Sequence, residues 1–462
     1  MGPVLIFDHT ERSGQKTVVV DDSTGSPNGI PLAKWLADGL IAAGVPFQAP
    51  TRGENGKPGN STTAGTLTTN AVQQQWFSEL FNKFILPKFK KDDKPFIAVF
   101  WSRDPDGTQH NQGDSLLKLV PGINGPTSLA AIKNADNALG KIGVALKDLG
   151  LQGTTDIIVS ADHGFSTISK QSSTSNAAKT HYADIPQDFL PPGFVAKDLS
   201  SALNLPLWDP DQNNASIAPD AHSKFTNGLL GSSPQNPLVI VAGNGGSDLI
   251  YLPQTEDKTK LHDLADKIIK ALLAQDYTSG LFVDDHLGSF PGTLSLTDIN
   301  LQGSALTPIP AIVVNFKSFA TGCAQATNCT VEVADTALQQ GQGMHGSFSR
   351  ADTYNFTAAY GPDFKKNFVD TAPVSNADIG KTIAAILKLT ISNHGTLWGR
   401  VLTESMPNGK IPQVVKSTMK SKKAENGLYT LLNYQKVGKT LYFDAAGFPG
   451  RTVGLNDDET KQ

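Results

Sequence analysis

Short apolar runs rich in Val, Ile and Phe alternate with longer amphipathic stretches along most of this 462-residue chain. Such alternation is typical of an α/β fold, in which helices connect the strands of a mostly parallel sheet. A chain of this length could form about three domains of roughly 150 residues, although α/β folds often form one larger unit. We therefore expect an α/β fold with a mostly parallel sheet, helices on both of its faces and a large buried core.

Two of the apolar runs indicate strands that one helix connects. The first is residues 96–101, which follows a predicted helix at 72–89, and the second is residues 156–159. Between them, apolar residues recur every three or four positions over 129–149, which predicts a helix that Ser128 caps. The pattern therefore predicts a strand, a crossover helix and a second strand.

The rest of the chain continues this pattern and ends differently. We expect a hairpin formed by residues 238–242 and 249–252, a helix at 258–274, a strand at 311–316, a helix at 377–388, and a terminal antiparallel hairpin formed by 427–434 and 439–444. The stretch 171–236 is dense in Pro, Asn, Ser and Asp, which predicts a loop-rich insertion over the sheet edge, and long loops are often functional. We expect a catalytic domain at 1–400 that includes this insertion, and a C-terminal extension with a β-hairpin at 401–462.

Charge and hydropathy argue against nucleic acid as a binding partner and against a membrane span. The chain has 39 Lys and Arg against 43 Asp and Glu, a net charge of -4, and no basic block of the kind that binds a nucleic-acid backbone. It has no run of 18 apolar residues, so we expect no membrane span. Its beginning lacks the basic region and apolar stretch of a signal peptide. These features favour a small-molecule substrate and leave the oligomeric state open.

The two cysteines, Cys323 and Cys329, lie close together in a polar, turn-like stretch. A short loop of this kind can bring two thiols within bridging distance, and a disulfide would indicate an oxidising compartment. Two unpaired thiols in a surface loop of a reduced protein are the alternative. The sequence leaves both possibilities open.

An acidic residue and a histidine follow the first predicted strand. Asp106 and His110 come after residues 96–101, at the strand end where ligands bind in open α/β sheets. Pro105 and Gly107 disfavour a regular helix there. We therefore expect the Asp106 and His110 side chains to turn toward a common point.

The second predicted strand ends in the same way. Asp162 and His163 follow it directly, and a turn at Gly164 can bring both side chains onto one cation. A third histidine, His345, has glycines on both sides, which allow the backbone to approach a ligand closely. Each motif alone is common by chance, and their occurrence together is not. Two carboxylates and three imidazoles form a ligand set for Zn²⁺ or a similar metal rather than for Ca²⁺, which prefers oxygen ligands.

These motifs together resemble a known superfamily. The order Asp-Pro-Asp-x-x-x-His, Ala-Asp-His-Gly and Gly-x-His-Gly is similar to that of the alkaline phosphatase superfamily, and within it to the type I phosphodiesterase/nucleotide pyrophosphatase branch. Residues 356–365 and 374–383 resemble the closing strand and helix of that branch. The resemblance covers about residues 95–389, without the polar insertion. It implies an alkaline phosphatase-like fold.

The resemblance also implies a site with two divalent metal ions, expected to be zinc. Asp106, His110 and His345 would hold one ion, and Asp162 and His163 would hold the other. Two ions about 3.5–4 Å apart stabilise both the attacking and the leaving oxygen of an in-line displacement at phosphorus. In this family a Thr or Ser hydroxyl is the nucleophile.

Two parts of the family pattern have no clear counterpart in this chain. An early strand that ends in Asp-Gly, with an Asp that binds the second metal, should precede Asp106, and the nucleophile should follow that strand at a helix start. The nearest imitations are Asp8, which His9 follows, and Thr68 in a Thr-rich loop. We therefore expect that the missing strand, its Asp and the nucleophile lie before Met1, and we assign no catalytic nucleophile.

The resemblance implies a metal-dependent hydrolase of phosphodiester or pyrophosphate bonds in small, nucleotide-like substrates. A phosphomonoesterase of the same superfamily and a non-catalytic fragment without a nucleophile are the alternatives. A sulfatase is disfavoured because neither cysteine lies in a Cys-x-Pro-x-Arg sequence. We expect the full-length parent to be periplasmic or secreted, because a missing N-terminal part would explain both the absent signal peptide and a disulfide. Surface solvation is the simpler explanation for the remaining candidates, namely His181, His222, Asp284, Asp285, His286, Arg103 and Lys365.

Overall fold

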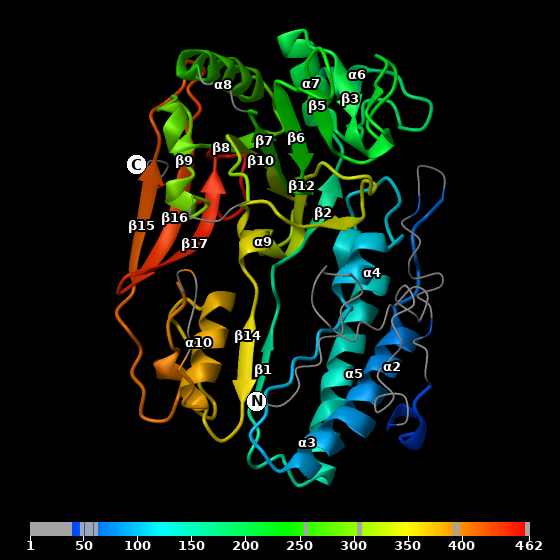
Figure 1. The fold of residues 1–462 in the computed structure, drawn as a ribbon, viewed down its shortest axis with the longest axis vertical. Helices are drawn as coiled ribbons and strands as arrows, with labels where there is room; N and C mark the ends of the chain where they lie inside the picture. Colours follow the sequence, from blue (N-terminus) through cyan, green and yellow to red (C-terminus); the bar gives the residue numbers. More distant parts are fainter. Residues whose placement is uncertain are drawn as a thin grey trace.

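The computed structural model describes residues 39–46, 50, 59, 63–253, 257–302, 307–390, 395 and 398–457. The strands in this part of the chain form an eight-stranded sheet, a four-stranded sheet, a three-stranded sheet and a two-stranded pair. Helices lie against these sheets in the upper and the lower half of the molecule (Figure 1). The α/β class expected from the sequence is therefore confirmed.

The largest sheet is mostly antiparallel. Its strand order is β4 (Ala215–Ser216), β3 (Leu207–Asp209), β5 (Gly228–Leu230), β6 (Val239–Gly243), β7 (Ser247–Tyr251), β10 (Ile312–Phe316), β8 (Thr278–Val283) and β9 (Leu294–Ser295). Only β8 and β9 pair in parallel, which differs from the expected mostly parallel arrangement. The physical reason is the length of the connections. A short turn such as the one between β6 and β7 can join only antiparallel neighbours, because a parallel pair needs a long crossover.

The two faces of this sheet are covered differently. Side chains alternate along each strand, so Leu281 and Val314 face a core built with α7 (Phe194–Leu203) and α8 (Lys258–Leu273). Phe282 and its neighbours face the C-terminal sheet. Helices therefore cover one face and a sheet covers the other, where we had expected helices on both.

The C-terminal sheet has three strands: β15 (Val415–Lys420), β16 (Leu431–Val437) and β17 (Thr440–Gly447). The last two form the expected hairpin. The sequence prediction missed β15, whose residues are mostly exposed and polar because it lies at the edge of the sheet. An edge strand with one solvated face lacks the apolar run from which we predicted strands.

The four-stranded sheet is formed by β11 (Ser318–Ala320), β12 (Thr330–Val333), β2 (Ser166–Ser169) and β13 (Gly343–Met344), in that order. Between β11 and β12, Cys323 and Cys329 form a disulfide, which decides the question that the sequence left open. The strands β2 and β12 pair in parallel.

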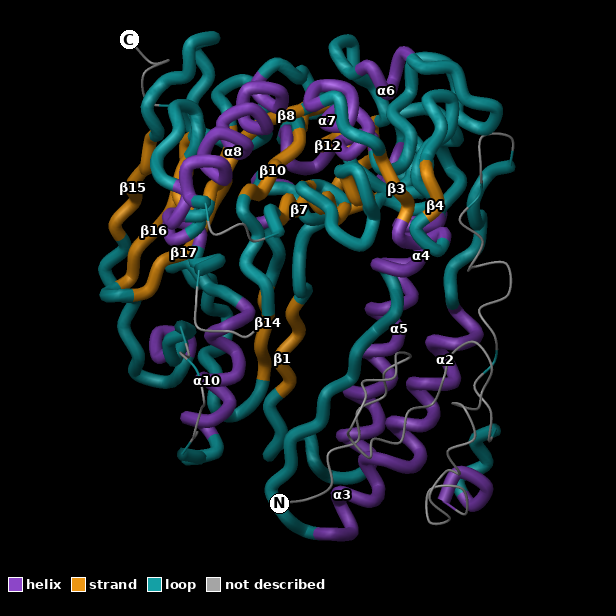
Figure 2. Tube along the Cα trace, turned by 45° about the horizontal axis from the view of Figure 1, so that its top comes forward, coloured by secondary structure: helices purple, strands orange, loops and turns teal. Residues whose placement is uncertain are grey.

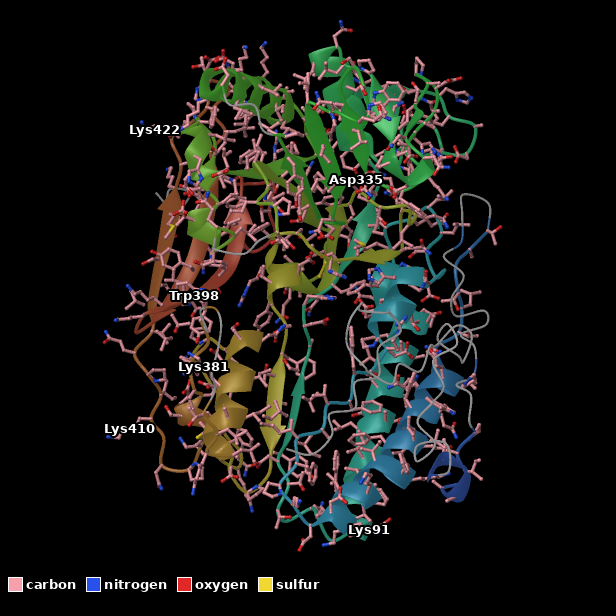
Figure 3. All side chains as sticks on the ribbon, viewed as in Figure 1. Lys91, Asp335, Lys381, Trp398, Lys410 and Lys422 are labelled. Carbon is pink, nitrogen blue, oxygen red and sulfur yellow. A yellow bond between two sulfur atoms is a disulfide. The ribbon has the colours of Figure 1, made fainter. Side chains whose placement is uncertain are left out.

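A buried lysine and a backbone hydrogen bond lie where this sheet meets the eight-stranded one. The Lys170 ammonium donates to the carbonyl of Ala334 at 2.9 Å, and burial lowers the pKa of Lys170 to about 8. The backbone N–H of Asp335 donates to the carbonyl of Gly245 beside β7. Asp335 lies inside the upper half of the molecule, whereas Lys91, Lys410 and Lys422 lie at its periphery (Figure 3).

The lower half holds a helical layer. The predicted helix at 72–89 is confirmed and extends further, as α2 (Ala71–Leu80), a π-helical turn (Phe81–Ile85) and α3 (Leu86–Asp92). The next long helix, α5 (Pro126–Asp148), begins before Ser128, so the predicted cap is wrong. The Asp114 carboxylate accepts a hydrogen bond from the Thr127 N–H at 2.8 Å and thereby satisfies a donor of the first turn.

Residues 96–101 are not assigned to a strand, although their sequence predicts one. Phe96, Ala98 and Phe100 pack against the helices, whereas the alternate side chains are exposed. The run is extended, but it has no ladder with any of the described strands. The following strand, β1 (Ile157–Ser160), pairs antiparallel with β14 (Thr357–Tyr360), so the expected strand-helix-strand unit does not form.

The remaining helical elements are short, except for α10, which has 11 residues. They are α4 (Asp106–Asn111), α6 (Asn176–Lys179), α9 (Arg350–Thr353), α10 (Asn376–Ile386) and single 3₁₀ turns at Gly122–Asn124, Pro210–Gln212, Asp285–Leu287, Thr297–Ile299, Ala326–Cys329 and Thr403–Ser405. The stretch 171–236 contributes α6, α7 and strands β3 to β5 and so forms the sheet edge itself.

In two views the β1–β14 pair lies between α5 and α10 (Figures 1 and 2). Among the described residues, no helix combines the length and the apolar character needed to cross a membrane.

Candidate metal centre

The first two candidate residues lie on a short helix. Asp106 is the first residue of α4 and His110 lies one turn later on the same face, so His110 Nε2 is 3.2 Å from Asp106 Oδ1. The expectation that Pro105 and Gly107 prevent a helix is wrong. Pro105 stands before the first turn, where its missing N–H costs little, and a single glycine is tolerated.

A buried carboxylate holds this helix in place. Asp104 is almost fully buried, and its two oxygens accept hydrogen bonds from Thr108 Oγ1 at 2.6 Å and Asn134 Nδ2 at 2.7 Å. Thr108 belongs to α4 and Asn134 to α5. Asp104 therefore joins the segment that carries Asp106 to the long helix behind it.

The second pair follows β1 directly, as expected. His163 Nε2 lies 3.5 Å from Asp162 Oδ1, and the carboxylate is largely exposed. The Asp162 carbonyl accepts a hydrogen bond from Asn376 Nδ2 at 2.8 Å, at the beginning of α10. The turn at Gly164 brings the backbone against α9, and a Cβ there would lie 1.9 Å from the carbonyl oxygen of Ala351.

His345 completes the group from a distant part of the sequence. It follows β13, and its ring stacks on that of His163 with centroids 3.5 Å apart and an interplanar angle of 18°. The Gly246 N–H donates to the His345 carbonyl at 3.0 Å. A Cβ on the neighbouring Gly245 would lie 2.8 Å from that carbonyl, so the close approach of these two segments depends on glycine.

All three imidazoles converge on one carboxylate oxygen. The distances from Asp106 Oδ1 to Nε2 are 3.2 Å for His110 and 3.9 Å for both His163 and His345. Within the described residues, the group able to hold one ion is Asp106, His163 and His345, whose ligand atoms lie within 4.8 Å of one another. The resemblance had divided His163 and His345 between two ions, whereas the structure stacks them on each other.

Hydrogen bonds orient two of these rings. His110 Nδ1 lies 2.9 Å from the carbonyl oxygen of Gly343, and His163 Nδ1 lies 2.9 Å from that of Gly164. Since a carbonyl only accepts, Nδ1 carries a proton in each ring, so the nitrogen left to bind a cation, once it is free of its proton, is Nε2, which faces the cluster. Fixing the tautomer in this way is typical of histidines that bind metal.

The charge states of the cluster also suit a cation. Burial and the neighbouring imidazoles of His163 and His110 lower the pKa of His345 to about 4, so the ring is neutral near pH 7. Burial opposes ionisation of Asp106, but the hydrogen bond from His110 and the three imidazoles outweigh it and lower the pKa of Asp106. A neutral imidazole and an ionised carboxylate are the forms that bind metal. The residues present therefore fit a zinc-type ion.

A small hollow opens beside the cluster. Its volume is about 300 Å³, and it is lined by Ala161, His163, Gly164, Tyr354, Asn355 and Phe356. Tyr354 and Phe356 are both largely exposed and lie on the same side of the extended chain, because side chains two residues apart share a face. The hollow therefore offers aromatic surface next to one of the candidate ligands.

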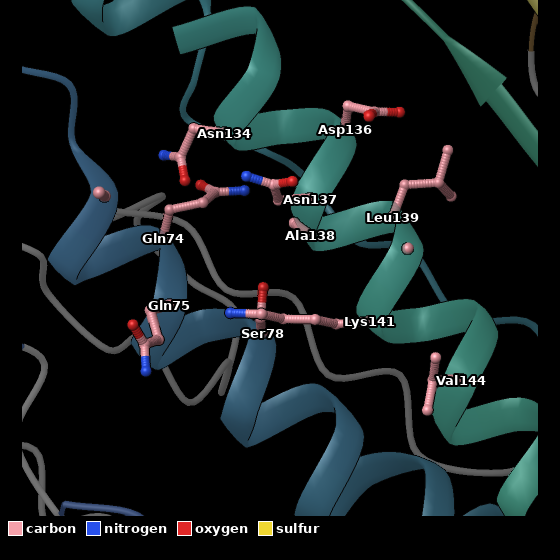
Figure 4. A pocket seen from close by; sticks show the side chains of 12 residues that line it. Gln74, Gln75, Ser78, Asn134, Asp136, Asn137, Ala138, Leu139, Lys141 and Val144 are labelled. Atoms are coloured by element: carbon pink, nitrogen blue, oxygen red, sulfur yellow. The ribbon is translucent and has the colours of Figure 1, made fainter. Parts of the chain in front are cut away.

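A larger cavity lies elsewhere. It has a volume of about 860 Å³ and lies between α2 and α5, where Gln74, Asn134 and Asn137 point toward one another (Figure 4). None of the five candidate ligands lines it. Size alone therefore does not indicate the site.

The weaker candidates lie outside the cluster. His286 is 83% exposed and contacts Asp284, and His222 contacts Asp184. Lys365 Nζ donates a hydrogen bond to the Gly409 carbonyl, which indicates a structural role rather than contact with a ligand. Thr68 lies just before α2, and Asp8, the nearest match to the missing metal ligand, falls outside the described residues.

Comparisons with known proteins give the family. The chain matches the family model described as type I phosphodiesterase/nucleotide pyrophosphatase over residues 48–346, more than half of its length. The comparison with curated proteins finds no match. Similar solved structures include human ectonucleotide pyrophosphatase/phosphodiesterase 5, at 15% identity and a TM-score of 0.39, over 72% of this chain and 64% of that chain. The murine protein of the same name is 16% identical with a TM-score of 0.40, over 70% of this chain and 62% of that chain. The chain thus spans slightly less than two thirds of either structure.

Proposed function

Because the chain belongs to the type I phosphodiesterase/nucleotide pyrophosphatase family, we propose that it hydrolyses phosphodiester or pyrophosphate bonds in small, nucleotide-like substrates. The observation that carries this proposal is the convergence of three Nε2 atoms on Asp106 Oδ1. The site would be the cluster of Asp106, His110, Asp162, His163 and His345. Three of these residues, Asp106, His163 and His345, form the one group among the described residues whose ligand atoms lie within 4.8 Å of one another.

The five side chains would hold two divalent ions, of which zinc fits the mixed nitrogen and oxygen ligands best. When bound, such ions act as Lewis acids that stabilise the charge on phosphoryl oxygens and activate an oxygen nucleophile. Asp106 lies within 4 Å of all three imidazoles and is therefore suited to serve both ions.

The residues themselves prepare the site. Near pH 7 His345 is neutral and Asp106 is ionised, so neither has to release a proton before it binds. The carbonyls of Gly343 and Gly164 keep the Nδ1 protons of His110 and His163 away from the cluster. The Asp106 helix is held from behind by Asp104.

The hollow beside His163 supports a planar or apolar substrate group. Tyr354 and Phe356 line the hollow and are largely exposed, and a base or an aryl ester could pack against them. The Cys323–Cys329 disulfide supports a periplasmic or secreted location.

Assays with two esters test the proposal. The purified chain, loaded with Zn²⁺, is incubated with bis-p-nitrophenyl phosphate and with p-nitrophenyl phosphate, and bound zinc is measured by mass spectrometry. Turnover of the diester that is lost in Asp106→Asn and kept in His286→Ala supports the proposal, because His286 lies outside the cluster. Faster turnover of the monoester would favour a phosphomonoesterase. Zinc binding without turnover of either ester would favour a non-catalytic protein.

A further inference from the structure

One buried carboxylate outside the cluster contacts both segments that carry its later histidines. Asp352 Oδ1 accepts a hydrogen bond from Ser166 Oγ at 2.6 Å. Asp352 Oδ2 accepts from the Ser347 N–H at 2.8 Å and from Ser347 Oγ at 2.9 Å. Ser166 lies three residues after His163, and Ser347 lies two residues after His345. A single side chain therefore joins the two segments whose imidazoles stack.

Backbone contacts reinforce this connection. The carbonyl oxygen of Asp352 accepts from the Gly164 N–H at 2.7 Å, directly after His163. Asn355 Nδ2 donates to the Ala161 carbonyl at 2.7 Å, two residues before His163. The segment 352–355 therefore fixes the turn at His163 on both sides.

A second buried acid lies behind Asp352. Glu332 is fully buried in β12, and neither of its carboxyl oxygens has a hydrogen-bond donor among the described residues. Burial and the negative charge of Asp352 raise the pKa of Glu332 well above its usual range. Burial and the neighbouring carboxylate therefore disfavour the ionised form of Glu332, whereas Asp352 accepts hydrogen bonds from Ser166 and Ser347.

The helix that carries Asp352 is attached to the C-terminal part of the chain. The Arg350 N–H donates to the Val453 carbonyl at 2.9 Å, and the Arg350 guanidinium lies 3.4 Å from the Asp444 carboxylate. Thr353 Oγ1 donates to the Asp444 carbonyl. Because Asp444 belongs to β17, the C-terminal sheet supports α9 and, through it, Asp352.

We propose that Asp352 is a positioning residue that holds the His163 and His345 segments at the separation needed for a metal ion. The proposal deepens the function proposed above and rests on it. Asp352 touches neither the substrate nor the ion in this assignment, and it acts only through Ser166, Ser347 and the Gly164 N–H.

The test uses the full chain and the isosteric variant Asp352→Asn. The variant replaces one carboxylate oxygen by an amide nitrogen, which donates and cannot accept, so the hydrogen bond from Ser166 or those from Ser347 are lost. We expect binding of Zn²⁺, measured by competition with a chromogenic chelator, to weaken about tenfold, as for other residues that orient metal ligands. The visible spectrum of bound Co²⁺ should shift, and kcat should fall about tenfold with KM unchanged.

Two variants separate positioning from simple loss of stability. Asp198→Asn alters a buried carboxylate on α7 that accepts a hydrogen bond from the Ala177 N–H, so it should lower stability and leave the Co²⁺ spectrum unchanged. Glu332→Gln keeps the size of the buried side chain and leaves the Asp352 hydrogen bonds to Ser166 and Ser347 in place, so it should bind Zn²⁺ within about twofold of the parent. If Asp352→Asn does not fold by circular dichroism, Ser166→Ala and Ser347→Ala remove its partners one at a time and should each shift the spectrum.

An Asp352→Asn chain with the parental Co²⁺ spectrum and Zn²⁺ affinity would overturn the inference and leave the proposed function intact. The same holds if Asp198→Asn shifts the spectrum as much as Asp352→Asn does. A parent chain that binds neither Zn²⁺ nor Co²⁺ would overturn the proposed function, and this inference with it.

Discussion

Asp106 and His345 come from opposite halves of the chain, yet Asp106 Oδ1 lies 3.9 Å from His345 Nε2. His163 lies at the same distance from that oxygen and stacks on His345. Three segments, after residue 101, after β1 and after β13, therefore meet at a single carboxylate. Four expected outcomes follow from this geometry and from the packing around it.

Removing the third imidazole should cost metal binding. In His345→Ala the cluster loses one of the three side chains whose ligand atoms lie within 4.8 Å of one another. We expect Zn²⁺ affinity to fall by about hundredfold or more, beyond the loss typical of residues that only orient ligands. Isothermal titration calorimetry measures the change, and His286→Ala is the control because its ring is 83% exposed and outside the cluster. Equal affinities in the two variants would remove His345 from the ligand set.

The aromatic hollow should affect substrate binding more than chemistry. Phe356→Ala removes an exposed ring beside His163, so we expect KM for bis-p-nitrophenyl phosphate to rise about tenfold, with kcat nearly unchanged. Steady-state kinetics measures both constants. Phe225→Ala, an exposed ring that does not line the hollow, is the matched control and should change neither. A tenfold fall in kcat at constant KM would contradict a role in binding.

The disulfide should contribute to stability. Cys323 and Cys329 close a short loop between β11 and β12. Loop-closure entropy predicts that the Cys323→Ser, Cys329→Ser double variant loses about 2 kcal/mol of unfolding free energy. Urea denaturation measures the loss, and dithiothreitol should destabilise the parent by a similar amount without affecting the variant. A parent chain that is equally stable with and without the reductant would contradict the prediction.

One carboxylate should make stability depend on pH in the acid range. Partial burial alone would raise the pKa of Asp276, but hydrogen bonds from Ser172, Ser173 and Thr174 outweigh it and lower the pKa to about 2. A depressed pKa adds stability above the unfolded value near 4, and this stability is lost as the pH falls toward 2. Asp276→Asn should therefore be less stable than the parent by about 1 kcal/mol at pH 7, allowing for solvent screening, and nearly equal to it at pH 2.

Thermal unfolding at a series of pH values checks this dependence. The exposed Asp92, which pairs with Lys88 on the surface of α3, provides the control, and Asp92→Asn should change stability little at any pH. A constant difference between Asp276→Asn and the parent from pH 7 to pH 2 would rule out the proposed linkage.

Local patterns predicted much of the fold. Residues 258–274 show a helical period, and α8 forms there with its apolar positions buried. The hairpin of β6 and β7 is likewise confirmed, because a short Gly-rich turn between two apolar runs leaves few other arrangements. The extended run at 96–101 shows the limit of this reasoning. Its composition suits a strand, but a strand also needs a partner with which to exchange hydrogen bonds.

The candidate ligands were also found from local patterns, because Asp and His next to glycine after an apolar run are visible in one dimension. Asp104 and Asp352 were missed. Each is a buried carboxylate whose partners lie on other elements, Asn134 for the first and Ser166 for the second. No spacing in the sequence reveals such a pairing. Only a satisfied set of hydrogen bonds in the folded chain distinguishes it from an ordinary exposed Asp.

The sequence by itself determined the α/β class, the main helices and the motifs by which the five candidate ligands were recognised, since these depend on the order and period of residue types. The tertiary structure decided which side chains meet: it stacked His163 on His345, centred the imidazoles on Asp106 and joined Cys323 to Cys329. It also decided that the strands of the eight-stranded sheet are mostly antiparallel and that the C-terminal sheet covers one face of that sheet. These outcomes depend on long-range packing and on satisfying buried polar groups, which no local stretch of sequence specifies.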